Sequence, residues 1–160
     1  ILYVTAFDFG ARGIHDAIVV ATMKNHVYVL DANNPSVVFW QNSYGAAIGA
    51  DTLAPEINTK CNPYSDISRW VGILSTPTID VASGTLYFVA RSNQAGTHAQ
   101  KLYAVSLADG SNRAGSPVEI AATYAGSGDP GKGSERPDAV ANGRFAFDPR
   151  QHNQLSLIHI

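Results

Sequence analysis

A pattern of strand, polar turn and strand occurs twice along this 160-residue chain and constrains its fold more than any other feature. The first copy spans residues 26–40, HVYVLDANNPSVVFW, and the second begins at Lys101 as KLYAVSLADG. Each copy joins a run of β-branched and aromatic residues to a cluster of turn formers, the composition of strands in a hairpin. Recurrence of such a unit predicts repeated antiparallel sheets.

The sequence around each copy extends the unit to four strands. Segments 1–5 and 18–22 read as strands before the first copy, and Asn25 tolerates the left-handed backbone that a hairpin turn needs. For the second unit we expect a strand that ends with residues 78–80, followed by strands at 85–90, 100–107 and 117–120. A turn at 82–84 and a longer tip at 91–99 would join the first three of these strands.

Two such units predict an all-β fold, a partial β-propeller of about two four-stranded antiparallel blades plus the start of a third. We expect a blade at about 1–40, an insertion at 41–74, a blade at about 75–121, a loop at 122–143 and the start of the next blade at 144–154. A closed ring has about four to eight blades of roughly 40 to 50 residues each. Residues 1–154 would therefore be an incomplete propeller, a fragment whose first partners are the remaining blades of the same chain.

The last six residues, LSLIHI, correspond to a translated transposase-type sequencing adapter, read as CTG TCT CTT ATA CAC ATC. We therefore expect residues 155–160 to be a non-native tail. The alternative is a genuine final strand, since the segment is apolar and partly alternating.

The two copies resemble the pyrroloquinoline-quinone-like (quinoprotein-type) β-propeller repeat, whose motif is Ala-x-Asp-x-x-Thr-Gly-x-x-x-Trp. In the first copy Asp31 matches and Trp40 arrives one residue late, and in the second Ala104 and Gly110 are in register. Gly84 lies in a stretch similar to the family's opening hairpin, and the resemblance covers about residues 15–121. It implies that these five residues build the ring, because an indole can wedge between blades and glycine supplies a positive φ in a turn.

The resemblance also implies an exported protein, periplasmic or secreted. The favoured function is a binding or assembly scaffold that meets a protein or glycan partner through loops such as 41–74 and 124–143. The alternative is part of a quinone-dependent dehydrogenase, which would use pyrroloquinoline quinone and calcium in an active site built mostly from other blades. That family's dehydrogenases hold the cofactor with adjacent cysteines, whereas Cys61 stands alone, so no cofactor is evident and a non-enzymatic role is favoured.

Cys61 itself has two interpretations. It is either a buried thiol or half of a disulfide whose partner lies outside this sequence, and the polar loop around it favours the disulfide in an exported protein. No catalytic role is assigned to it.

The insertion 41–74 is long and rich in Gly, Asn, Pro and Ser, and such insertions often carry specificity. It contains Glu56 and leads through Arg69 and Trp70 to Ser75, and we take these four as candidate ligand-binding residues. Arg69 and Trp70 would present a cation and an aromatic plate, which suits a carboxylate or a sugar. The alternative is that Trp70 is buried in the interface between blades and that Arg69 binds carbonyl groups of the loop. The usual burial of aromatic residues favours this alternative.

Several other classes of function are not supported. A net charge of −2 provides no basic field for nucleic acid or an anionic membrane, and no apolar run is long enough for a transmembrane helix. Residues 126–132, GSGDPGK, imitate a phosphate loop, but Gly133 replaces the hydroxyl residue and no helix is expected to follow. The five histidines are scattered, so no metal site is predicted.

Overall fold

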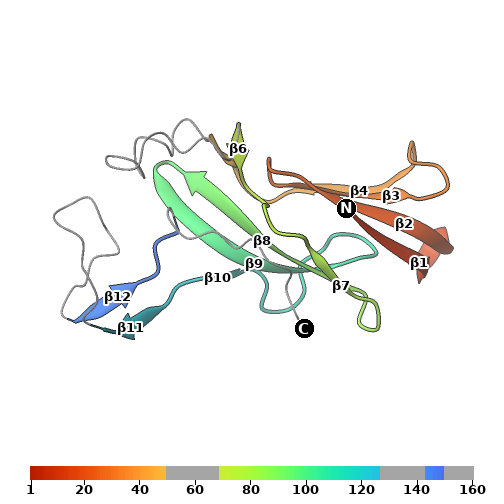
Figure 1. Ribbon diagram of the computed structural model, residues 1–160. Helices are drawn as coiled ribbons and strands as arrows, with labels where there is room; N and C mark the ends of the chain where they lie inside the picture. Colours follow the sequence, from red (N-terminus) through yellow and green to blue (C-terminus); the bar gives the residue numbers. More distant parts are fainter. Residues whose placement is uncertain (50–68, 127–142, 150–160) are drawn as a thin grey trace.

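The computed structural model describes residues 1–49, 69–126 and 143–149. Within these residues the chain is all-β apart from one short 3₁₀ turn at Gly10–Arg12. Two four-stranded antiparallel sheets follow one another along the chain, and a two-stranded ribbon follows the second (Figure 1). The predicted fold class, a partial β-propeller with two blades and the start of a third, is confirmed. In the described part the sheets stay separate, and no strand pairing closes them into a ring.

The first sheet is a simple meander of four neighbouring strands. It consists of β1 (Leu2–Asp8), β2 (Ile14–Ala21), β3 (His26–Asp31) and β4 (Val38–Ser43), paired in that order. In β3 the valines at 27 and 29 are buried and Tyr28 between them is only partly covered, because successive side chains of a strand point to opposite faces. β4 extends three residues past Trp40, which the sequence predicted to be its last residue.

The second sheet repeats this topology with the order β10-β9-β8-β7. Its strands are β7 (Thr78–Asp80), β8 (Thr85–Gln94), β9 (Thr97–Ser106) and β10 (Val118–Glu119). Two short ribbons complete the described structure: β5 (Ile48–Gly49) with β6 (Trp70–Val71), and β11 (Thr123–Ala125) with β12 (Arg144–Ala146). No helix in these residues is long and apolar enough to cross a membrane.

The hairpin of β8 and β9 corrects one prediction. The expected tip at 91–99 is wrong, because pairing continues to Gln94 and Thr97 and leaves only Ala95 and Gly96 in the turn. Both turn residues have left-handed φ, +51° and +88°, as a type I′ turn requires. The backbone N–H of Gly96 donates to Asn93 Oδ1 at 2.8 Å. The sequence signal was weak because Ala-Gly is not the Asn-Gly pair that usually marks this turn.

One hydrophobic core is shared by both sheets. The first sheet contributes Val19, Val29 and Trp40 to it, and the second contributes Phe88 and Val105, all buried. The sheets therefore pack against each other like adjacent blades, and the surfaces between them position the groups described below.

Aspartates close several hairpin turns by accepting hydrogen bonds from residues just beyond them. Asp31 accepts the backbone N–H of Asn33 at 2.7 Å. Asp80 and Asp109 accept the hydroxyl of a nearby serine at 2.6 and 2.7 Å. These bonds favour the ionised carboxylates, so the backbone N–H of Asn33 lowers the pKa of Asp31 and the serine hydroxyls lower the pKa values of Asp80 and Asp109.

Acid is therefore expected to destabilise the fold through these turns. A carboxyl whose pKa is lower in the folded state adds stability that is complete well above its unfolded pKa of 3.8 and is lost as the pH falls through the folded value. When urea denaturation is measured at a series of pH values, the urea concentration at the midpoint of unfolding should be constant above about pH 5 and fall below about pH 4. Asp80→Asn should show a smaller decline than the parent chain. Identical pH profiles for the two proteins would contradict the assignment.

Candidate functional site between the two blades

Trp40 joins the two blades. The side chain extends from β4, is only 8% exposed, and its indole Nε1 donates to the carbonyl oxygen of Leu107 at 2.8 Å. The ring also lies against Gly110, where an added Cβ would stand 2.7 Å from ring carbon Cε3. Gly110 has a φ of +74°, so glycine suits this position for both space and backbone conformation. The tryptophan of one repeat and the glycine of the next thus form one joint.

Asn25 forms a second joint farther along β8. It lies in the turn between β2 and β3 with a φ of +62°, which confirms the predicted left-handed turn residue. Its fully buried amide donates to the carbonyl oxygen of Arg91 at 2.7 Å and to that of Gly45 at 3.3 Å. Gly72 packs against the same turn so closely that a Cβ there would lie 2.4 Å from the Met23 carbonyl oxygen. This joint ties the first sheet to the second through buried hydrogen bonds.

A pocket of about 370 Å³ lies between the first sheet and the β8–β9 hairpin. Residues of both joints border it, because Gly45 and Gly110 are part of its wall. Amide, hydroxyl and ammonium groups make up most of the remaining lining. These residues are Asn42, Ser43, Tyr44, Ser92, Gln94, Lys101, Tyr103 and Asn112.

Two tyrosines form the aromatic part of the wall. Tyr44 packs edge-on against Tyr103 and Phe88, with ring centroids 4.8 and 4.7 Å apart, and the rings of Phe88 and Tyr103 stack at 5.3 Å. Burial raises the pKa of Tyr44, whose buried hydroxyl has no hydrogen-bond partner among the described residues. Burial also raises the pKa of Tyr103. Both phenols therefore stay protonated at neutral pH and keep their capacity to donate a hydrogen bond.

The polar lining defines what this pocket can bind. The amides of Asn42, Gln94 and Asn112 each offer donors and an acceptor, although Asn42 already donates to the Gly110 carbonyl oxygen at 3.1 Å. Among the described residues that line it there is no carboxylate, imidazole or thiol, and Lys101 is the one charged side chain. Amide, hydroxyl and ammonium groups of this kind can hydrogen-bond to a small polar ligand.

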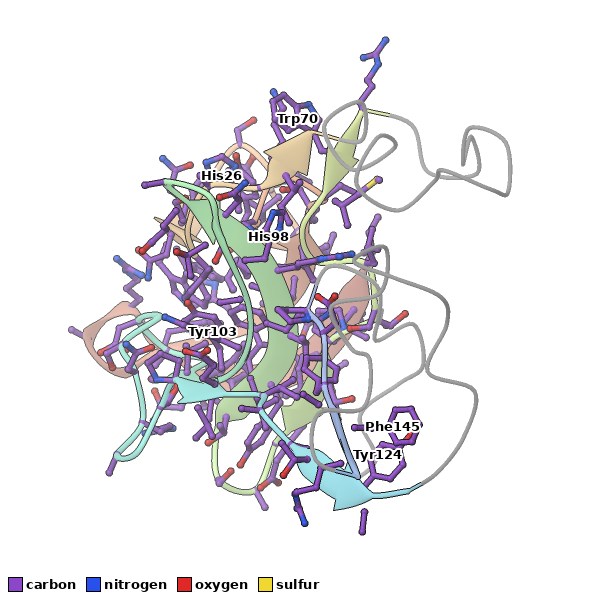
Figure 2. All side chains as sticks on the ribbon, turned by 90° about the vertical axis from the view of Figure 1, so that its left-hand side faces the viewer. His26, Trp70, His98, Tyr103, Tyr124 and Phe145 are labelled. Carbon is purple, nitrogen blue, oxygen red and sulfur yellow. The ribbon has the colours of Figure 1, made fainter. Side chains whose placement is uncertain are left out.

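Of the four sequence-predicted ligand residues, the three that the structure describes lie outside the pocket lining. Trp70 is 37% exposed on the β5–β6 ribbon, where the Lys24 Nζ lies 5.1 Å from its ring centroid, and Figure 2 shows it well separated from Tyr103. Arg69 is exposed with a φ of +73°, and Ser75 is buried with no hydrogen-bond partner for its hydroxyl among the described residues. Glu56 lies outside the described residues, as does Cys61.

The expectation that Trp70 plugs the blade interface is wrong. In the β5–β6 ribbon, Val71 pairs with Ile48 and both side chains are buried. Alternation along a strand then turns the neighbouring Trp70 to the opposite face, where it is partly exposed.

Four of the five residues predicted to build the ring lie at a turn or at the blade interface, and Ala104 does not. Asp31 accepts hydrogen bonds within its turn and lies 3.0 Å from the Nδ1 of His15. Gly84 has a φ of +61°, and a Cβ there would come within 3.1 Å of the Phe7 ring across the interface. Ala104 lies inside β9. Of the predicted structural residues, Gly110 borders the inter-blade pocket.

Sequence reasoning missed the residues that line the pocket. Lys101 and Tyr103 belong to the second repeat copy, but they looked like ordinary strand residues, and Asn42 and Tyr44 fall where an insertion was expected. Nothing in their spacing shows that the end of β4 and the residues just after it lie against β8 and β9. Among the described residues, no three His, Cys, Asp or Glu side chains gather where they could hold a metal ion.

Comparisons of the chain with protein-family models, with curated proteins and with solved structures find no significant match. Membership of the quinoprotein-type repeat family therefore stays a prediction that depends on the motif residues.

Proposed function

We propose that this chain is part of an exported β-propeller of the pyrroloquinoline-quinone-like repeat type and acts as a binding scaffold, with the inter-blade pocket as its ligand site. The observation that carries the proposal is the joint at Trp40, where the indole of one repeat copy binds Leu107 and covers Gly110 of the next. Because that contact joins residues of two successive repeat copies, each copy packs as one blade against the next. Export is supported by the family resemblance.

The pocket supports binding because it is built on strands. Ser92 and Gln94 come from β8 and Lys101 and Tyr103 from β9, whose pairing continues through all ten residues of each strand. A site on paired strands needs little rearrangement to receive a ligand, which lowers the entropic cost of binding. Its volume lies within the usual range for small-molecule sites, about 300 to 1,000 Å³.

Saturation-transfer NMR tests the proposal by measuring the binding of a panel of small polar compounds. The panel contains neutral and acidic monosaccharides, disaccharides and linear polyols. We expect saturable binding of at least one compound and no chemical change in it. The double variant Gln94→Ala/Asn112→Ala should weaken that binding at least about tenfold, the effect of losing one or two hydrogen bonds. Gln41→Ala, an exposed change on β4 outside the lining, is the matched control and should leave the affinity unchanged.

Two outcomes would overturn the proposal. One is the absence of any binding that depends on Gln94 and Asn112. The other is reduction of a redox dye by the chain after addition of pyrroloquinoline quinone, calcium and an alcohol or sugar, which would favour the dehydrogenase alternative.

A further inference from the structure

Lys101 is the one charged residue among the described residues of the pocket lining, and it is placed to act on a ligand. Lys101 lies on β9 directly opposite Glu119 of β10. Glu119 is exposed and outside the lining, and among the described residues no ion pair joins it to Lys101. The ammonium group therefore contributes a positive charge to the pocket wall, with a carboxylate near it that competes only weakly across solvent.

The neutral groups around Lys101 suit a ring with several hydroxyls. A side-chain amide places a donor beside an acceptor, which matches two neighbouring hydroxyls, and Gln94 and Asn112 are both in the lining. The Tyr103 ring adds an apolar face that can cover the C–H groups of a sugar, and its protonated phenol adds a donor. Tyr, Asn and Ser are also the residue types that proteins use for adaptable polar recognition.

We infer that the inter-blade pocket selects a saccharide that carries a carboxylate, a uronic acid unit, with Lys101 as the specificity-determining residue. The inference rests on the proposed function. One lysine balances one carboxylate, whereas a phosphate monoester brings nearly two negative charges and would leave one of them unmatched. A charge-assisted hydrogen bond from Lys101 should favour the acid over the neutral sugar by about 10- to 100-fold.

Isothermal titration with glucuronic acid and glucose, which share a ring and differ at carbon 6, tests the inference. We expect the acid to bind at least about tenfold more tightly. Lys101→Met should remove the difference by weakening the acid alone, and Lys101→Arg should restore most of it. Glu119→Gln should tighten binding of the acid, because it removes the nearby negative charge. Lys24→Met, which changes the lysine beside Trp70, is the matched control and should change neither affinity.

The outcomes separate this inference from the proposed function. Equal affinities for the two sugars, or a preference for the acid that survives Lys101→Met, would overturn the inference and leave the binding scaffold intact. Failure of both sugars to bind while another panel member binds through Gln94 and Asn112 would also overturn only the inference. Failure of every panel member would overturn the proposed function as well. Circular dichroism of each variant confirms that a lost affinity does not come from unfolding.

Discussion

Replacement of Trp40 by alanine is expected to lower the free energy of unfolding by about 3 to 5 kcal/mol, the usual cost of removing a large buried aromatic side chain. The indole is almost completely buried between the two sheets, so its loss leaves a cavity in their shared core. The change also removes the hydrogen bond to Leu107 and leaves a buried carbonyl oxygen without its donor. Urea denaturation followed by far-ultraviolet circular dichroism measures the effect.

The chain provides its own control in Trp70, the second of its two tryptophans. Trp70→Ala should cost less than about 1 kcal/mol, because that side chain is partly exposed on a short ribbon. Gly110→Ala adds a test of the joint, since the new methyl group would meet the Trp40 ring, and its cost should fall when Trp40 is already alanine. A loss below about 1 kcal/mol for Trp40→Ala would show that the indole does not hold the blades together.

Replacement of Asn25 by alanine is expected to cost about 3 to 5 kcal/mol, through two separate effects. Alanine is strained at the φ of +62°, which asparagine tolerates better. It also leaves the carbonyl oxygens of Arg91 and Gly45 without the donor that now reaches them from the turn. Urea denaturation at neutral pH measures the total.

Asn25→Gly separates the two effects. Glycine accepts the left-handed backbone without strain, so the variant should be about 1 to 2 kcal/mol more stable than Asn25→Ala and still less stable than the parent chain. Asn25→Asp keeps the size of the side chain but places carboxylate oxygens against the same carbonyls, and it should be at least as damaging as alanine. Full stability in Asn25→Gly would show that the amide does not join the sheets.

The parts of this fold that could be predicted depend on local chemistry. Strands at 27–30 and 85–90 follow from runs of β-branched and aromatic residues, and the turns at Asn25 and Gly84 follow from residues that accept a positive φ. The two-residue turn at Ala95 escaped prediction because alanine rarely takes that conformation. The burial of Trp70 was predicted wrongly because it depends on the β5–β6 ribbon. Pairing of Val71 with Ile48 buries that face of the ribbon, and Trp70 lies on the other face.

The candidate site depends on how distant segments meet. Asn42 and Tyr44 are far in sequence from Lys101 and Tyr103, and no spacing rule places them on one wall. The pattern of alternating residues and turn formers determined by itself that this chain forms successive four-stranded antiparallel sheets, since those preferences act between near neighbours. Only the tertiary structure decided that Trp40 and Asn25 bridge the sheets and that a polar pocket bordered by Lys101 lies between them. The physical reason is that burial and charge at an interface depend on which surfaces come together.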